Sequence, residues 1–169
     1  MTHLLPIIAA GQIGRKEIRG KNLGPEVTKY QRATSLEPGA WPWCAAFVDW
    51  VLQQWLKDPK VVKWLGFKTT TAAQWRPRTA LAYGFTKWAE DRPNTVTILP
   101  DTATPEPGDI VMYDFSHVGF VDHNQNRLSF LSVEGNTNAA GSRDGDGVWS
   151  KVRSRSIARN FLRIHPSQA

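Results

Sequence analysis

The chain has 169 residues, 41% of them hydrophobic, with a formal net charge of +6 and a single cysteine. This length and composition are typical of one globular domain with a full core, so we expect a single domain over residues 1–169. The sequence contains no run of about 18 or more apolar residues, which excludes a transmembrane helix. One cysteine excludes an internal disulfide, and with scattered histidines it cannot build a four-ligand zinc site. We expect no cofactor.

The N-terminal segment lacks the features of a secretory signal. Neither Lys nor Arg precedes the short apolar stretch at residues 4–10, and Pro6 interrupts that stretch. We therefore expect a protein that is made in the cytoplasm without a signal peptide.

The first half of the chain, up to Arg92, is predicted to be mainly helical. Pro25 suits the first turn of a helix, and from Cys44 apolar residues recur at helical spacing until Pro59 prevents continuation. The pattern over residues 59–77 is irregular, and a proline-rich connector follows the last helix. The expected helices cover residues 6–18, 24–34, 44–55 and 79–90.

After Gly108 the pattern changes to short β-prone runs separated by polar turns. Helices followed by consecutive strands indicate an α+β fold, in which the N-terminal helices pack on a C-terminal antiparallel β-sheet. The expected strands cover residues 109–113, 117–122, 128–133, 147–152 and 161–164.

Cys44 is predicted to lie in the first turn of its helix, after a rigid Trp-Pro-Trp approach. The unpaired amide groups of a helix N-terminus carry partial positive charge, which stabilises a thiolate. Since a disulfide and a zinc site are excluded, Cys44 is either an inert core residue or a nucleophile.

A nucleophilic thiol needs a base, and His117 is the best placed of the four histidines. His3 and His165 lie near the chain ends. His117 opens a predicted strand directly after a turn, where an imidazole can reach the rim of a sheet. His123 lies about 20 Å further along, so only one of these two can meet Cys44. A purely structural His117 is equally compatible with the sequence.

Glu134 and Asn136 lie at the end of the following strand, and residues two apart in a strand face the same way. A carboxylate or carboxamide beside His117 would accept its second ring N–H, fix the tautomer and stabilise the imidazolium. An ordinary strand-ending turn uses the same residue types. Together with Cys44, however, they complete a thiol–imidazole–acceptor set.

The chain has eight tryptophans, which is a high count for its length. We expect Trp50 and Trp55 in the core, and Trp41, Trp43 and Tyr113 at a substrate-binding cleft lined with rings.

Basic residues concentrate toward the C-terminus, where Lys151, Arg153 and Arg155 alternate and would share one face of a strand. Such a face attracts anionic polymers of the cell envelope, an anionic membrane or nucleic acid. Nucleic acid is disfavoured because no aromatic-basic motif accompanies the charges. A solvated strand edge, on which charges discourage aggregation, is the simpler interpretation.

The candidate residues fall within four short motifs: Pro42-Trp43-Cys44-Ala45-Ala46-Phe47-Val48, Pro107-Gly108-Asp109-Ile110-Val111, His117-Val118-Gly119-Phe120-Val121 and Val133-Glu134-Gly135-Asn136. In combination they resemble the CHAP family, the cysteine, histidine-dependent amidohydrolases/peptidases, and in particular its phage-type peptidoglycan hydrolases. The similarity runs from about residue 8 to about residue 155.

The resemblance implies a papain-like core with Cys44 as nucleophile and His117 as general base. Glu134 would orient the histidine, and Asn136 would be an auxiliary polar group. The implied reaction is hydrolysis of an amide bond in peptidoglycan, by an N-acetylmuramoyl-L-alanine amidase or by an endopeptidase of the stem or cross-bridge. The protein would act on the cell wall after release or delivery, as an endolysin or another bacteriolytic enzyme. Calcium-binding members carry an acidic loop before the cysteine, whereas this chain has Arg15-Lys16-Glu17-Ile18-Arg19 there, so no metal is implied.

Two other classes stay open at this point. A cysteine hydrolase or deamidase that acts on a protein would use the same residues. A non-catalytic module that binds the envelope or nucleic acid would instead use the basic C-terminal face. A monomer is expected in each case.

Overall fold

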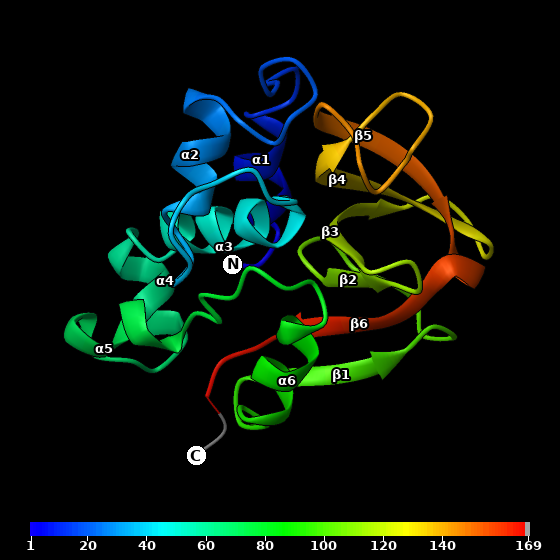
Figure 1. The fold of residues 1–169 in the computed structure, drawn as a ribbon. Coiled ribbons are helices and arrows are strands. Elements are labelled where there is room, and N and C mark those ends of the chain that lie inside the picture. The colour runs from blue at the N-terminus through cyan, green and yellow to red at the C-terminus, as the bar shows by residue number, and fades with distance from the viewer. Residues whose placement is uncertain (168–169) are drawn as a thin grey trace.

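The computed structural model describes residues 1–167, in which six short α-helices precede the six strands of a β-sheet (Figure 1). The prediction of an α+β fold is confirmed. Within residues 1–167 none of the helices has the length and apolar character needed to cross a membrane. The helices are α1 (Leu4–Ala10), α2 (Pro25–Gln31), α3 (Cys44–Trp55), α4 (Pro59–Trp64), α5 (Thr69–Trp75) and α6 (Gly84–Glu90).

The sheet has six strands in the order β1-β6-β2-β3-β4-β5, and every neighbouring pair is antiparallel. The central strands are buried on both faces, because α3 covers one face and a second apolar cluster fills part of the other. The strands are β1 (Val96–Pro100), β2 (Ile110–Tyr113), β3 (His117–Asn124), β4 (Ser129–Thr137), β5 (Gly147–Ser154) and β6 (Ala158–Ile164), with a 3-10 turn, η1 (Arg155–Ile157), between the last two.

Several boundaries differ from the sequence prediction. The first helix ends at Ala10 and not near residue 18, because the chain turns at Gly11 and then forms a bridge to β5. Residues 59–77, which show no regular pattern, form α4 and α5. Asp58 caps α4 by accepting a hydrogen bond from the Lys60 amide, and Pro59 occupies the first turn. The connector also holds a strand that the sequence analysis missed, β1, which pairs with β6.

Helix α3 is the element that joins the helical half to the sheet. It packs on β3 and β4, and it is buried on all sides from Cys44 to Asp49 and on one side from there to Trp55. The approach is close because Gly135 in β4 has no side chain. A Cβ atom at this position would lie 2.6 Å from Cβ of Phe47 and 2.9 Å from the ring of Trp43. Gly135 therefore allows β4 to lie directly against the start of the cysteine helix.

Candidate active site

Cys44 is the first residue of α3, as predicted, and its thiol is free. The residue is only 6% exposed, and it borders a pocket of about 180 Å³. Apolar residues from 36–42 and 80–82 form most of the pocket wall, and Ser116 and Arg143 provide its polar part. The thiol is therefore inside the fold but at the edge of a space that a ligand can enter.

His117 and Glu134 form a fully buried pair on neighbouring strands. His117 opens β3 directly after Ser116, which has a positive φ of 59°, and Glu134 lies near the end of β4. His117 Nε2 lies 2.9 Å from Glu134 Oε2, and both side chains are 0% exposed. Gly119 makes room for this pair, since a Cβ atom there would lie 2.6 Å from Cγ of Glu134.

The other ring nitrogen of His117, Nδ1, is the one available to Cys44. It is buried and forms no well-aligned hydrogen bond with any residue of 1–167. Burial alone would lower the pKa of the imidazole, but the adjacent Cys44 thiolate and hydrogen bonding to Cys44 and Glu134 together raise the pKa of His117 to about 9. The charged imidazolium is thus favoured when it stands between a thiolate and a carboxylate.

The Glu134 carboxylate is held by four donors besides the histidine-facing contact. Arg153 donates from Nε to Oε1 at 2.8 Å and from Nη2 to Oε2 at 2.5 Å. Tyr113 and Ser132 donate their hydroxyls to Oε1 at 2.7 and 2.5 Å. Burial alone would raise the pKa of Glu134, but the hydrogen bonds and charges of Arg153 and His117 outweigh it and lower the pKa far below its ordinary value. Glu134 is therefore ionised at neutral pH.

Arg153 belongs to this cluster, although its place in the sequence predicted a role on a basic strand face. Its guanidinium lies over the rings of Tyr113 and Phe115, 5.2 and 5.5 Å from their centroids, and Nη1 donates to the Gly141 carbonyl. The residue is 8% exposed. The prediction of a basic face shared by Lys151, Arg153 and Arg155 is wrong for Arg153, because its charge is neutralised by the buried Glu134.

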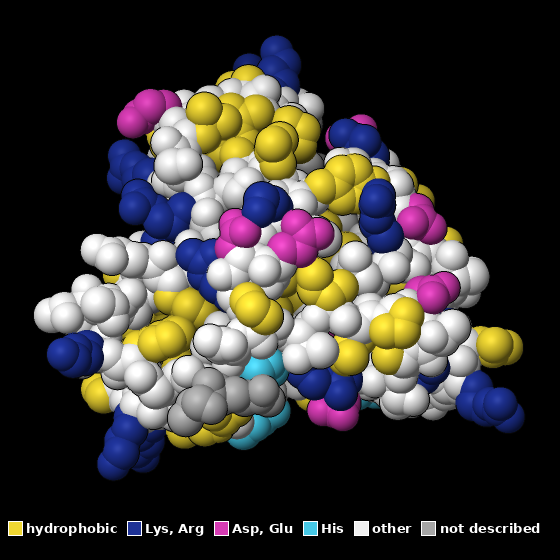
Figure 2. All heavy atoms as spheres, turned by 90° about the horizontal axis from the view of Figure 1, so that it is seen from below, with side chains coloured by type: hydrophobic (Ala, Val, Ile, Leu, Met, Phe, Trp, Pro, Cys, Tyr) yellow, Lys and Arg dark blue, Asp and Glu magenta, His cyan; other side chains and the backbone are white. Residues whose placement is uncertain are grey.

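Figure 2 shows the face of the molecule that is lowest in Figure 1. There the Lys and Arg side chains are distributed around the molecule with Asp and Glu among them, and they do not gather into one stripe.

Of the three residues predicted to contact substrate, the structure places one at the pocket and two in the interior. Trp41 lines the pocket beside Cys44, as expected. Trp43 and Tyr113, expected at the cleft, are 0% exposed and do not line this pocket. Trp43 stacks on Tyr30 and lies close to Gly135 of β4. Tyr113 faces the interior, where its hydroxyl donates to Glu134. The expectation of a substrate contact is therefore corrected for both.

Asn136 is buried two residues after Glu134, but its recorded bond leads away from the histidine. Its Nδ2 donates to the Arg143 carbonyl at 3.3 Å, and Oδ1 has no hydrogen-bond partner within residues 1–167. Its φ of 56° falls where β4 departs from regular geometry. Asn136 thus braces the 137–145 loop, which brings Arg143 to the pocket.

His123 lies at the far, exposed end of β3. The prediction that it lies in the following turn is wrong. It pairs with the neighbouring Asp122 at 3.0 Å and is separated from Cys44 by most of the strand. Within residues 1–167 no group of three or more His, Cys, Asp or Glu side chains is arranged to hold a metal ion.

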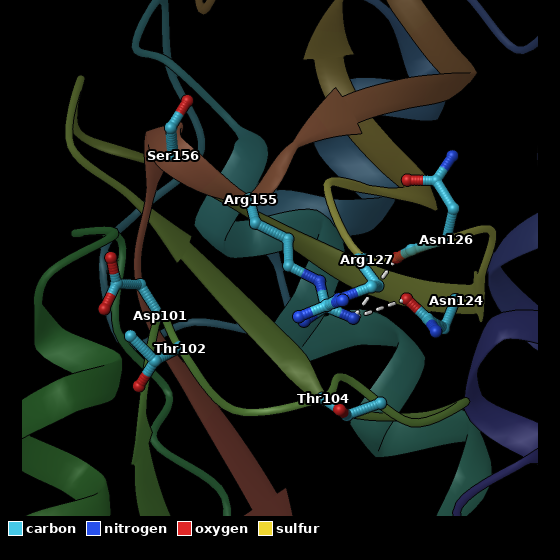
Figure 3. A pocket seen from close by; sticks show the side chains of 8 residues that line it. All are labelled: Asp101, Thr102, Thr104, Asn124, Asn126, Arg127, Arg155 and Ser156. Atoms are coloured by element: carbon cyan, nitrogen blue, oxygen red, sulfur yellow. Dashed lines mark hydrogen bonds between the residues drawn. The ribbon is translucent and has the colours of Figure 1, made fainter.

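A second pocket, of about 640 Å³, lies at the opposite end of β3 from His117. Three connections line it, at residues 101–104, 124–127 and 155–156 (Figure 3). None of the residues described for the thiol site lines this pocket. Its volume, greater than that of the pocket beside Cys44, therefore does not make it the candidate active site.

A helix-terminal thiol beside a buried imidazole–carboxylate pair, on an α+β scaffold, is the organisation of a cysteine hydrolase. The family model for the CHAP domain matches residues 36–136, which is more than half of the chain and includes all four predicted catalytic residues. The chain belongs to the CHAP domain family, whose members are generally cysteine- and histidine-dependent amidohydrolases. A search of curated proteins gives no match.

Proposed function

We propose that this protein hydrolyses an amide bond of peptidoglycan through a thioester on Cys44. The observation that carries the proposal is the buried His117–Glu134 pair, whose remaining ring nitrogen is left for the thiol at the mouth of a pocket. Membership of the CHAP domain family supports amide hydrolysis of this kind.

The proposed reaction begins from a Cys44 thiolate and a His117 imidazolium, which the raised pKa of the histidine favours. The sulfur attacks the amide carbonyl, and the backbone N–H at the start of α3 stabilises the oxyanion. His117 gives its proton to the leaving amine as the C–N bond breaks, which leaves a thioester. The neutral imidazole then takes a proton from water, the hydroxide attacks the thioester, and the carboxylic acid and Cys44 thiol are released.

The pocket beside Cys44 favours a small apolar group next to the bond that is cut. Its walls are mostly apolar, and its volume of about 180 Å³ is small for a ligand pocket. Arg143 brings a half-exposed guanidinium to the rim, where it donates to the Phe115 carbonyl at 3.5 Å. Alanine methyl groups beside carboxylates occur in peptidoglycan stems, so both the amidase and the endopeptidase reactions fit this pocket.

Purified peptidoglycan incubated with the protein tests the proposal directly, with the new termini identified by mass spectrometry. A new N-terminal L-Ala marks the amidase, and a new terminus within the stem or cross-bridge marks the endopeptidase. Cys44→Ala should abolish product formation without unfolding the protein. His123→Ala, the matched control, should keep most of the activity because its side chain is exposed and far from the thiol.

Full activity of Cys44→Ala would show that the thiol is not the nucleophile. If peptidoglycan yields no new termini while protein substrates are hydrolysed or deamidated, the substrate assignment is wrong and the alternative cysteine-hydrolase class is supported.

A further inference from the structure

The pocket at the far end of β3 has a chemistry that the catalytic proposal does not use. Its lining side chains are all polar or charged: three hydroxyls, two carboxamides, two guanidinium groups and one carboxylate. In Figure 3 the Arg155 side chain lies in the middle, with Arg127 beside it and Asp101 across the hollow. A site in which every lining side chain carries a polar group favours a hydrated, hydroxyl-bearing ligand over a purely apolar one.

The two arginines give the pocket its charge preference. Arg155 Nη2 donates to Asn124 Oδ1 at 2.8 Å and to the Asn126 carbonyl at 3.3 Å, so neutral groups hold the guanidinium in place. Its Nε atom is buried without a hydrogen-bond partner, and within residues 1–167 neither Arg155 nor Arg127 forms an ion pair. Two guanidinium groups against the single Asp101 leave a net positive site with unused donors, which suits a carboxylate or a phosphodiester.

Hydrogen bonds fix the backbone segments that carry the two arginines. The Asn126 side chain accepts from the amides of Leu128 and Ser129 at 2.8 and 3.0 Å, which fixes the turn between β3 and β4. The Arg155 amide donates to the Leu128 carbonyl at 2.8 Å, which ties η1 to the same turn. The donors of Arg155 are therefore positioned before a ligand arrives, so less of its side-chain freedom is lost on binding. Arg127 lies in the same turn with an exposed side chain.

The distance to the thiol site decides what kind of ligand can use both places. β3 runs from His117 to Asn124, and eight residues at roughly 3.3 Å each separate the ends by roughly 20 Å or more. One small molecule cannot span this separation, whereas an extended polymer can. Contact at a second point on a polymer raises the local concentration of the cleavable bonds at the first.

We propose that the Arg127–Arg155 pocket binds an anionic, hydroxyl-rich polymer of the cell envelope and retains the enzyme on its substrate. This rests on the proposed function for the identity of the surface but not on the catalytic steps. The anionic groups can be the carboxylates of the peptidoglycan stem peptides, next to the hydroxyl-rich glycan, or the phosphodiesters of a polyol polymer attached to it. Both present the same chemistry to the two arginines.

Binding to purified cell walls tests this with Cys44→Ala as the parent, so that hydrolysis does not interfere. Co-sedimentation is measured for Arg127→Gln/Arg155→Gln and for Lys60→Gln/Lys68→Gln, a control that removes the same charge from exposed positions on another surface. We expect the arginine variant to bind about tenfold more weakly, since each lost charge-assisted contact contributes to affinity, and the lysine control to bind nearly as the parent does. Walls stripped of phosphate polymers separate the two sources: retained binding identifies the carboxylates, and lost binding the phosphodiesters.

Equal loss in the arginine variant and the lysine control would overturn the proposal, because it would reduce the effect to net charge. Unchanged binding of the arginine variant would overturn it as well. The same arginine substitutions in the active protein should leave hydrolysis of a soluble peptidoglycan fragment within about twofold of the parent. A failure of the catalytic proposal would instead show in that assay for both proteins, while the binding difference would persist.

Discussion

Within residues 1–167, two carboxylate–arginine pairs have both side chains buried, and they behave differently. Glu134 and Arg153 lie in the sheet, and Asp49 of α3 pairs with Arg76 at 3.0 Å. Every oxygen of Glu134 is hydrogen-bonded, whereas Oδ2 of Asp49 is buried and has no hydrogen-bond partner within residues 1–167. Both pairs contain an arginine, but only the carboxylate of Glu134 has both oxygens hydrogen-bonded.

This difference moves the pKa of the two carboxyls in opposite directions. Burial favours the neutral acid at both positions. At Glu134 the hydrogen bonds and charges of Arg153 and His117 overcome burial and hold the pKa far below its ordinary value. At Asp49 burial outweighs the charge of Arg76 and the backbone amides of Arg78 and Thr79, and it raises the pKa to about 7. A buried carboxyl is therefore not kept ionised by an arginine and part of a donor set, and we infer that the full set around Glu134 makes the difference.

The pair in the sheet supports the chemistry of the site, and the pair at α3 supports the scaffold. Arg76 also donates to the Ala33 carbonyl, so the Asp49 pair ties the cysteine helix to two loops. Removing charge from the sheet pair should change activity, and removing it from the α3 pair should change only stability.

The largest effect is expected for Glu134→Gln. The amide keeps the size of the side chain but cannot stabilise the imidazolium, and it leaves Arg153 without its counter-charge. We expect kcat to fall by about 10³-fold, by analogy with the loss of an orienting carboxylate in other triads. Hydrolysis of a soluble peptidoglycan fragment measures this. Ser132→Ala, which removes one hydrogen bond to Glu134 but keeps the charge, should lose only a few-fold. Near-normal activity of Glu134→Gln would show that His117 needs no carboxylate.

A smaller effect, about 10- to 100-fold, is expected for Arg153→Met, since Arg153 acts through Glu134 as a positioning residue. Without the guanidinium the pKa of Glu134 rises, so the carboxylate is protonated at a higher pH. The acid limb of the pH profile of kcat/KM should therefore move to higher pH. Arg153→Lys should restore part of the activity, because it returns the charge without the paired donors.

Lys151→Met is the matched control, since it removes one charge from the next basic position on the same face of β5. We expect its pH profile to coincide with that of the parent. If Arg153→Met lowers activity equally at every pH, the arginine only supports the fold.

Arg153 also marks the limit of what the sequence predicts. The thiol at the start of α3 follows from local helical spacing, and the His117 strand from period-two patterning. Arg153 is opposite Phe130 in the register, so its side chain reaches Glu134 by running along the sheet. The contact between Arg153 and Glu134 cannot be predicted from local sequence. It depends on the pairing of β4 with β5 and on the direction of one long side chain.

The burial of Trp43 and Tyr113 has the same cause. Their residue types suit a cleft, but the contact of Gly135 with the start of α3 decides the position of Trp43. Tyr113 faces inward because Glu134 needs its hydroxyl. The strand β1 was missed because prolines surround it in the connector, although Val96, Thr97 and Ile98 are β-prone and pair with β6. Local sequence thus predicts the elements around the site, α3, β3 and β4, and their mutual packing decides which side chains reach it.

The smallest effect on activity, and the clearest effect on stability, is expected for Asp49→Asn. A carboxyl with a folded pKa of about 7 and an unfolded pKa near 3.9 binds a proton more tightly in the folded state. Its stabilising contribution is complete below about pH 4 and is lost as the pH rises toward 7. His117, whose folded pKa is also raised, loses its contribution in a higher window, as the pH rises from about 6.5 through about 9. Glu134 has the opposite sign, because its contribution is lost as the pH falls below about 4.

Urea unfolding of the parent and of Asp49→Asn at pH 5 and pH 8 isolates the Asp49 contribution, since His117 and Glu134 are common to both proteins. Asparagine keeps an acceptor for Arg76 but does not titrate. The free energy of unfolding of the parent should fall relative to the variant by roughly 2 kcal/mol between the two pH values, with hydrolytic activity little changed. Parallel pH dependences would mean that Asp49 is ionised in the folded protein, and the contrast with Glu134 would then not rest on hydrogen-bond completeness.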